Sequence, residues 1–486
     1  MWNKPRITVQ ECEFDLDHPV HIQKRRFLHL WSLRHCAAPI WVPVRRSQKF
    51  QYGTRCRNGQ YVSVASSISK LSPCHPPAHF DEPTSDSDLV KHIKGIIKFR
   101  GGPISVAEFM EEALTNSKAG FYMNRDVFGA TGDFITSPEI SQMFGEMIGV
   151  WVMCLWEKMN KPTKVNLVEL GPGRGMLMAD LLRALSKFKN FTESLNVCLV
   201  ECSPTLQKLQ YENLKCIDVD DNGENGEKKA NSSLAGTPIT WHPLFEQVPS
   251  GLPMIMIAHE FIDALPIHQF QRMSRGWCEK LVDFSDHCSF RFVLSPHRTP
   301  ATPCLMKRLG WAAKDEIEKL NHIEICPKAM DLTHAIARRL GSDGGGALII
   351  DYGQNGLVSD TLQAIKGHRF VDVLDDPGTA DLSSYVDFDS IRHSALEASD
   401  NVHIFGPISQ SKLLGCLGIN YRAEALLQNC TEKQAEALEI GYWRLVGDGA
   451  APFWEGPHEK SPMGMGTRYS AMAIVNRALG IPIAFE

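Results

Sequence analysis

The chain has 486 residues, of which 43% are hydrophobic, and its net charge at pH 7 is -5. This length suits two domains, or one large α/β unit, with a sizeable core. The acidic balance argues against a general nucleic-acid-binding protein, which needs a concentrated basic face, and no apolar run approaches the roughly 20 residues that cross a bilayer.

The N-terminal region is basic and poor in acidic residues. From His18 to Phe80 there is no Asp or Glu, while Lys and Arg recur and Ser is frequent from Ser63 to Ser72. This composition is typical of an organelle transit peptide, and a disordered basic tail is the alternative. The acidic residues between Glu11 and Asp17 do not fit a transit peptide, so the natural start of the chain stays open. We assign residues 1–87 to a transit peptide and a disordered lead-in.

Residues 88–160 are predicted to form an N-terminal helical segment. Apolar residues recur at helical spacing from Leu89 to Phe99, and Ser105 with Glu108 forms a capping box for a second helix. A loop rich in glycine and aromatic residues follows. It ends at Ser137, which we expect to cap a third helix that begins with a proline.

The most informative segment is N-L-V-E-L-G-P-G-R-G, from Asn166 to Gly175. Its short apolar run predicts a buried parallel strand, and Met176 to Leu185 shows the spacing of a helix. Between the two, Gly171, Gly173 and Gly175 allow the backbone to approach a ligand closely, because a Cβ at these positions would occupy the ligand's space. The segment therefore predicts a ligand site, and a tight connection without a ligand is the alternative.

The spacing of the glycines separates two classes of cofactor. A dinucleotide site expects G-x-G-x-x-G, but here the third glycine comes one residue early. Glu169, two residues before the first glycine, can meet a cation, and Glu201 ends the next predicted strand, where an acid can accept both ribose hydroxyls. S-adenosylmethionine carries an ammonium and a sulfonium and no phosphate, so the pattern favours it over NAD.

Alternating strand and helix signals continue through the rest of the chain. Buried strands are predicted at Met254–Ala258 and Ala347–Tyr352, with short antiparallel strands inserted near residues 267–325. This alternation predicts an α/β, Rossmann-like fold with a parallel sheet in a domain from 161 to 478, and ligands at the carboxyl ends of its strands. Residues 479–486 form the predicted C-terminal tail.

Two further features are less informative. The stretch from Asp218 to Ala235 is polar and contains Gly and Asn, which predicts a loop. The 14 cysteines form no C-x-x-C pair and have no His partner at metal spacing. We therefore predict free thiols and no metal site.

A second group of candidate residues follows the strand at Met254–Ala258. His259 and Glu260 can receive a nitrogen acceptor, and Glu260 with Asp263 can bind a guanidinium through paired hydrogen bonds. An arginine acceptor starts protonated, so nearby carboxylates must localise its charge and take its proton as the methyl group arrives. Capping of the following turn is the alternative role for the two acids.

Several segments resemble the mitochondrial complex I assembly factor family called MidA. They include V-E-L-G-P-G-R-G, H-E-F-I-D-A-L-P-I-H-Q-F, L-I-I-D-Y-G, the Asp375–Phe388 segment and the Gly132–Glu146 segment. The resemblance spans about Leu89 to Asn476. It implies a class I S-adenosylmethionine-dependent methyltransferase that dimethylates an arginine in a core subunit of respiratory complex I, in the mitochondrial matrix.

The resemblance also implies roles for individual residues. The glycine turn and Glu201 match the family's cofactor loop and ribose-binding acid, and His259, Glu260 and Asp263 match its acceptor-site signature, which makes them the candidate catalytic residues. Gly132 and Asp133 match an upstream motif that can form a lid and bind the cofactor. In the C-terminal part only Met465 and Gly466 match the family's late motif.

Two other hypotheses remain at this point. One is a non-catalytic complex I assembly chaperone that retains a cofactor-binding fold for stability. The other is an NAD-dependent enzyme, which the early third glycine disfavours. The leading hypothesis expects a protein substrate, no nucleic acid and no membrane span, and leaves the oligomeric state open.

Overall fold

The computed structural model describes residues 86–128, 135–218, 228–285, 289–447 and 464–486. The transit peptide predicted within residues 1–87 lies almost entirely outside the described residues. The candidate cofactor-binding residues Gly132 and Asp133 also lie outside them.

The centre of the main sheet consists of short apolar strands. β2 (Val165–Leu170), β3 (Leu195–Val200), β7 (Met254–His259) and β12 (Gly345–Gln354) are buried over most of their length and run parallel, in the order β12, β7, β2, β3. Helices α11 (Pro327–Asp343) and α12 (Phe388–Ala398) share one apolar core with these strands. Burial on both faces explains why the strands are continuous apolar runs rather than alternating ones.

Antiparallel strands extend this ten-stranded sheet at both ends. Its order is β17-β18-β12-β7-β2-β3-β6-β5-β4, with β16 (Val386–Asp387) paired to β12. The outer strands are β4 (Cys216–Asp218), β5 (Lys229–Ser232), β6 (Thr237–His242), β17 (Val402–Ser409) and β18 (Tyr469–Asn476). Of these, β6 is parallel to β3, and β5 and β18 are antiparallel to their inner neighbours. The predicted α/β fold is confirmed, but the sheet is parallel only in its centre.

Two local predictions are wrong. The polar stretch predicted as a loop contains β5, whose backbone pairs with β6 although its K-A-N-S sequence lacks an apolar run. The helix expected to start at Ser137 is split into α4 (Ser137–Ile140) and α5 (Gln142–Lys158). Ser141 between them is extended, with φ -161° and ψ 137°, and its hydroxyl accepts a hydrogen bond from the Met143 N–H. The serine side chain thus caps α5 instead of continuing α4.

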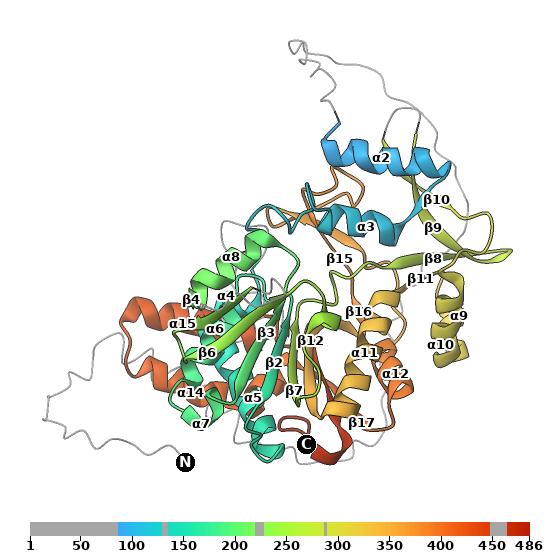
Figure 1. Ribbon diagram of the computed structural model, residues 1–486. Helices are drawn as coiled ribbons and strands as arrows, with labels where there is room; N and C mark the ends of the chain where they lie inside the picture. Colours follow the sequence, from blue (N-terminus) through green and yellow to red (C-terminus); the bar gives the residue numbers. More distant parts are fainter. Residues whose placement is uncertain (1–85, 129–134, 219–227, 286–288, 448–463) are drawn as a thin grey trace, which may run out of the picture. The chain divides into compact units, whose positions relative to one another are not determined.

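Further antiparallel strands and the N-terminal helices form a second part of the molecule (Figure 1). The insertion contains β8 (His268–Met273), β9 (Gly276–Phe284), β10 (Phe290–Leu294), β11 (His322–Ile325), α9 (Thr302–Trp311) and α10 (Lys314–Lys319), and β1 (Ile104–Ser105) pairs with β9. A three-stranded sheet combines β13 (Gln363–Lys366), β14 (Arg369–Val371) and β15 (Asp381–Ser383). Residues of both sheets pack in one core with α2 (Asp88–Arg100) and α3 (Val106–Thr115).

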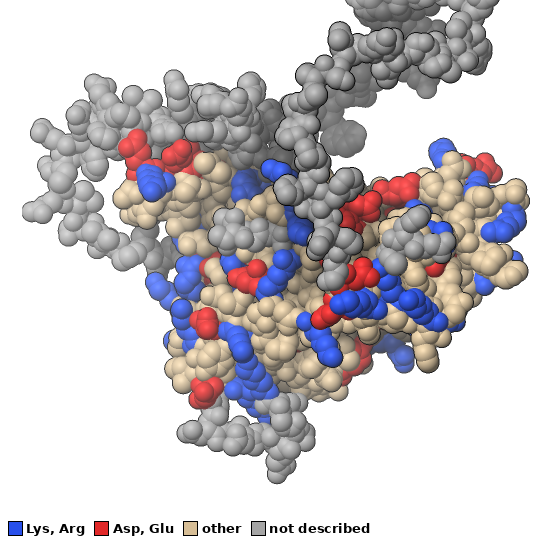
Figure 2. Space-filling view, turned by 90° about the horizontal axis from the view of Figure 1, so that it is seen from above, with Lys and Arg blue, Asp and Glu red and all other residues tan. Residues whose placement is uncertain are grey.

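The remaining helices surround the main sheet. They are α6 (Met176–Leu185), α7 (Lys189–Thr192), α8 (Pro204–Asn213), α12 (Phe388–Ala398), α13 (Gln410–Leu417), α14 (Ile419–Leu427) and α15 (Glu432–Val446). Within the described ranges, none of the helices is long and apolar enough to span a bilayer. On the face shown in Figure 2, basic and acidic side chains are interspersed rather than gathered into one basic area.

Candidate active site

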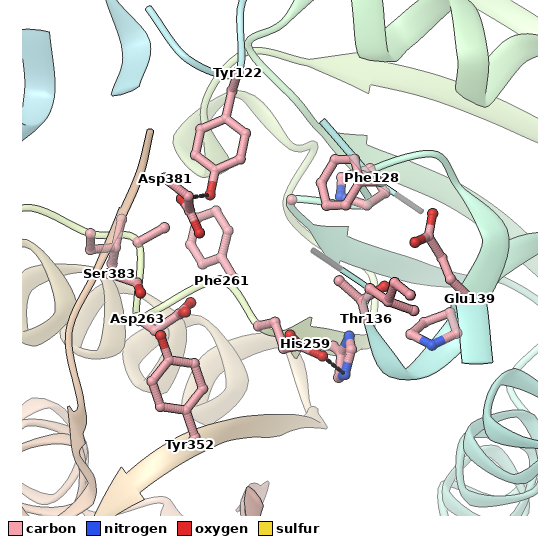
Figure 3. A pocket seen from close by; sticks show the side chains of 18 of the residues that line it. Tyr122, Phe128, Thr136, Glu139, His259, Phe261, Asp263, Tyr352, Asp381 and Ser383 are labelled. Carbon is pink, nitrogen blue, oxygen red and sulfur yellow. Dashed lines mark hydrogen bonds and ion pairs between the residues drawn. The ribbon is translucent and has the colours of Figure 1, made fainter. Parts of the chain in front are cut away.

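A cavity of about 760 Å³ lies at the carboxyl ends of the central parallel strands. Its walls include the glycine turn after β2, Glu201 after β3 and the loop after β7, so the three strand ends that the sequence singled out meet in one place. Sheet β13–β15 and the segment that precedes α4 complete the walls. Figure 3 shows Asp263, Asp381 and Tyr352 on one side of the cavity and Phe128 and Glu139 on the other.

Each glycine of the turn adopts a left-handed backbone conformation. The φ angles of Gly171, Gly173 and Gly175 are 57°, 53° and 77°. A Cβ at Gly171 would lie 2.6 Å from the Phe261 ring, and a Cβ at Gly173 would lie 3.2 Å from the Phe128 ring. Side chains here would be strained and would fill the floor of the cavity.

Gly175 has a different role from the other two glycines. It caps α6 and does not line the cavity. A Cβ at Gly175 would lie 3.3 Å from Cα of Gln210 in α8. The third glycine therefore allows α8 to pack closely against the turn.

Glu169 is a buried carboxylate at the floor of the cavity. Its residue is 3% exposed, and its Oε2 atom has no hydrogen-bond partner among the described residues. Burial raises the pKa of Glu169 to about 8. A buried acid without a counter-charge suits a ligand that brings a positive charge.

Glu201 is held in place by a residue that the sequence analysis missed. Its Oε1 accepts a hydrogen bond from the Ser203 N–H at 2.8 Å, and its Oε2 accepts one from Nε2 of Gln210 at 3.1 Å. Burial raises the pKa of Glu201 to about 7, against these hydrogen bonds, which lower it.

Gln210 is fully buried and connects the two halves of the cofactor region. The indole N–H of Trp241 can only donate, so it fixes the Gln210 oxygen as its acceptor at 2.9 Å. The amide nitrogen then donates to both the Gly173 carbonyl, at 2.8 Å, and Glu201. A buried glutamine in a helix has no distinguishing sequence signal, because its partners come from three separate elements.

Asp263 presents an open oxygen on the side of the cavity that the loop after β7 forms. Its residue is 8% exposed, and Oδ1 has no hydrogen-bond partner within the described part of the chain. Burial and the negative charges of Asp351, Asp381 and Glu260 raise the pKa of Asp263 well above its ordinary value, against a hydrogen bond from Tyr352, which lowers it.

Asp351 holds the loop that carries Asp263. Its Oδ2 accepts hydrogen bonds from the backbone N–H groups of Phe261, Ile262 and Asp263, at 3.3, 3.0 and 3.3 Å. Burial raises the pKa of Asp351 to about 7. A carboxylate at the end of β12 thus orients the acceptor loop after β7.

Glu260 is more engaged than the sequence analysis expected. Its Oε1 accepts a hydrogen bond from the Ser137 N–H, and its Oε2 accepts one from the Tyr469 hydroxyl, both at 3.3 Å. Nε2 of His259 lies 3.1 Å from Oε1, but the angles are not those of a hydrogen bond. His259 is buried, with its ring 4.7 Å from that of Phe144. Both residues line the cavity, yet Glu260 mainly joins the end of β7 to α4 and β18.

Asp381 and Tyr122 also belong to the acidic wall and were not predicted. The Tyr122 hydroxyl donates a hydrogen bond to Oδ1 of Asp381 at 2.6 Å, and Asp381 is 7% exposed. Burial and the charges of Asp381, Asp263 and Glu260 raise the pKa of Tyr122 well above its ordinary value, so it stays a donor.

On the side of the cavity opposite Asp263, an arginine forms ion pairs with two acidic residues. Arg174, inside the glycine turn, binds Asp126 with its Nη2 2.5 Å from Oδ2, and its Nη1 lies 3.3 Å from Oε1 of Glu139. Thr136 and Glu139 line the cavity. Within the described ranges, no group of three or more His, Cys, Asp or Glu residues is arranged to hold a metal ion.

Comparison with known proteins assigns the chain to a family. Residues 147–408 match the profile of a family described as S-adenosyl-L-methionine-dependent methyltransferases. The chain is 40% identical to protein arginine methyltransferase NDUFAF7, mitochondrial, of Danio rerio, over 81% of this chain and 88% of that protein. The chain belongs to the NDUFAF7 family of methyltransferases. The resemblance to MidA proteins is thereby confirmed.

Other comparisons agree with this assignment. The protein of the same name from Homo sapiens is 37% identical over 80% of this chain and 83% of its own length. A crystal structure from Burkholderia thailandensis, bound to S-adenosylhomocysteine, has the same fold, with a TM-score of 0.64 and 21% identity over 82% of this chain and 93% of that chain. The chain is a methyltransferase, its cofactor is S-adenosyl-L-methionine, and the NAD hypothesis is wrong.

The residues present fit this cofactor. The unpartnered Glu169 oxygen suits an ammonium, and the Glu201 carboxylate suits ribose hydroxyls. Gly171 and Gly173 line the cavity, and a Cβ at either position would crowd the Phe261 or Phe128 ring beside it.

Proposed function

We propose that the enzyme methylates an arginine in a core subunit of complex I during assembly, in the mitochondrial matrix. The names of its relatives support an arginine acceptor and a mitochondrial location. The basic N-terminal region supports import into the organelle. Complex I as the target rests on the resemblance to the MidA family.

The observation that carries the arginine acceptor is the open oxygen of Asp263. It lies in a buried wall where Asp351, Asp381 and Glu260 add further negative charge. A guanidinium is a planar cation whose fork of N–H donors matches a carboxylate in two parallel hydrogen bonds. A neutral or anionic acceptor would leave these buried acids without compensation.

The cofactor would be held by Glu169, Glu201, Gly171 and Gly173. It supplies a methyl group bound to a positively charged sulfur, which needs no covalent catalyst. What the protein provides is alignment of the acceptor with that group. Asp351 contributes to alignment because it fixes the backbone on both sides of Ile262.

Asp263 would act as the base. A guanidinium nitrogen has no free lone pair, so the acceptor must lose one proton for each methyl group that it gains. Asp263 would localise the positive charge on the neighbouring nitrogens and would accept the N–H proton of the nitrogen that receives the methyl group. Burial and the neighbouring acids raise the pKa of Asp263, and a guanidinium bound next to it would favour the ionised form that can accept a proton.

The pKa of Glu169 predicts that cofactor binding releases a proton. At pH 7 the buried carboxyl of the cofactor-free enzyme is mostly protonated, since its pKa is about 8. The ammonium of the bound cofactor, next to this carboxyl, would favour its ionised form and lower the pKa of Glu169. Calorimetry in buffers of different ionisation enthalpy should show proton release at pH 7, and Glu169→Gln should remove most of it.

The same group gives a stability test. Because the folded-state pKa of Glu169 exceeds the ordinary value of 4.5, the free energy of unfolding of the cofactor-free enzyme should fall as pH rises from about 4.5 through about 8. Glu169→Gln should flatten this slope. If Glu169→Gln changes neither the slope of the free energy of unfolding against pH nor the proton release, the ammonium of the cofactor does not bind at Glu169.

Mass spectrometry tests the proposed function. Each purified complex I core subunit is incubated with the enzyme and S-adenosylmethionine carrying a labelled methyl group. We expect label on one arginine of one subunit, and none with Asp263→Asn. If the wild type binds the cofactor but labels no subunit, the core subunits of complex I are not its substrates.

A further inference from the structure

One face of the β13–β15 sheet forms part of the cavity wall. The residues of this face that line the cavity are Gln363, Ile365, Phe370, Asp381 and Ser383. The alternate residues Ala364 and Leu382 are buried in the core shared with α2 and α3. Because side chains alternate along a strand, the sheet has one packed face and one face turned to the cavity.

The register of this sheet places three cavity residues in one row. Ile365 is opposite Asp381 on one side and opposite Phe370 on the other. Neighbouring strands are about 4.8 Å apart, so Phe370 lies roughly 10 Å from Asp381 across the sheet. The exposed fraction of the residue rises along the row, from 7% at Asp381 to 76% at Phe370. The row therefore leads from the buried acidic wall to the mouth of the cavity.

A second aromatic side chain is exposed at the same cavity. Tyr385 is 45% exposed and lines it, with its ring edge-on to Tyr352 at a centroid distance of 5.6 Å. Its backbone N–H donates a hydrogen bond to the Thr361 hydroxyl, four residues before Ile365, so Tyr385 lies roughly 13 Å along the strand from the row of Phe370, Ile365 and Asp381 and is not part of it.

We propose that Phe370 and Ile365, which are opposite each other in this row, bind an apolar side chain that flanks the target arginine in the substrate protein. The inference rests on the proposed function. With the guanidinium at Asp263, the backbone of the substrate lies toward the mouth, and a residue one or two positions along an extended chain is roughly 3.5 to 7 Å further on. A flanking residue at this distance from the arginine can contact Phe370. A small-molecule acceptor has no flanking residue and would not need an apolar surface at the mouth of the cavity.

Kinetics with altered flanking residues test this inference. The probe is the complex I core subunit that labelling identifies, in two versions whose residues on both sides of the arginine are either Leu or Ser. We expect the KM of the wild-type enzyme to be roughly tenfold lower for the Leu version, as burial of an apolar side chain requires. Phe370→Ala should remove this difference with kcat and cofactor affinity unchanged, and Phe370→Leu should restore part of it.

Phe99→Ala is the matched control, because Phe99 is 94% exposed and does not line the cavity. It should keep the full preference. Equal KM values of the wild type for both versions, or an undiminished preference in Phe370→Ala, would overturn the inference while the proposed function stands. If no subunit is labelled at all, the proposed function fails first.

Discussion

Gly173→Val should abolish S-adenosylmethionine binding in an enzyme that still folds. The φ angle of Gly173 is 53°, where a β-branched residue is strained by roughly 1–2 kcal/mol. Its side chain would also project toward the Phe128 ring, into the cavity. Calorimetry with the cofactor measures the loss, and thermal unfolding shows whether the variant is folded.

Gly236→Val is the control that distinguishes the effect of backbone strain from the effect of a side chain in the cavity. Gly236 has a similar φ of 71°, and a Cβ there would meet no atom within 4 Å. This control should lose a similar amount of stability and keep its cofactor affinity. Unchanged affinity in a folded Gly173→Val variant would refute the placement of the cofactor at this turn.

Asp263→Asn should abolish methyl transfer and leave cofactor affinity intact. The substitution keeps the shape of the side chain but removes the charge and the base, and general-base catalysis contributes roughly 10²- to 10⁴-fold. The labelling rate with the identified subunit measures this loss. Calorimetry measures the cofactor affinity separately.

Unfolding cannot explain such a result, because the same variant should be more stable. The pKa of Asp263 is raised in the folded state, so its ionisation destabilises the fold increasingly as pH rises. At pH 8 the Asn variant should therefore melt above the wild type. Asp315→Asn, at a side chain that is 78% exposed in α10, is the control and should change neither property. Near-normal labelling by Asp263→Asn would remove Asp263 from the reaction.

Of the predictions that depended on local sequence, two were accurate in detail. The helix predicted at Met176–Leu185 has these bounds in the structure, and the predicted capping box of Ser105 and Glu108 is present. Glycine spacing and hydrophobic period reflect interactions between residues close in the chain, so sequence alone can reveal them. The break at Ser141 was missed because its hydroxyl supports either a helix interior or a cap.

The acidic wall was predicted only in part. Asp263 was found because it follows a recognisable strand, whereas Asp381 and Tyr122 form a hydrogen bond between residues 259 positions apart. Glu260 was expected to face the acceptor, but its oxygens already bind Ser137 and Tyr469 from other elements. Hydrogen-bond partners that lie far apart in the sequence produce no periodic pattern from which they could be predicted.

Sequence by itself determined the α/β class and placed the glycine turn and Glu201 at the ends of parallel strands, since each depends on a short segment and on what lies just after a strand. The tertiary structure decided which carboxylate is open. Asp263 keeps a free oxygen and Glu260 does not, because α4 and β18 reach Glu260 alone. The availability of a buried charge depends on every group packed around it, and only the folded chain brings those groups together.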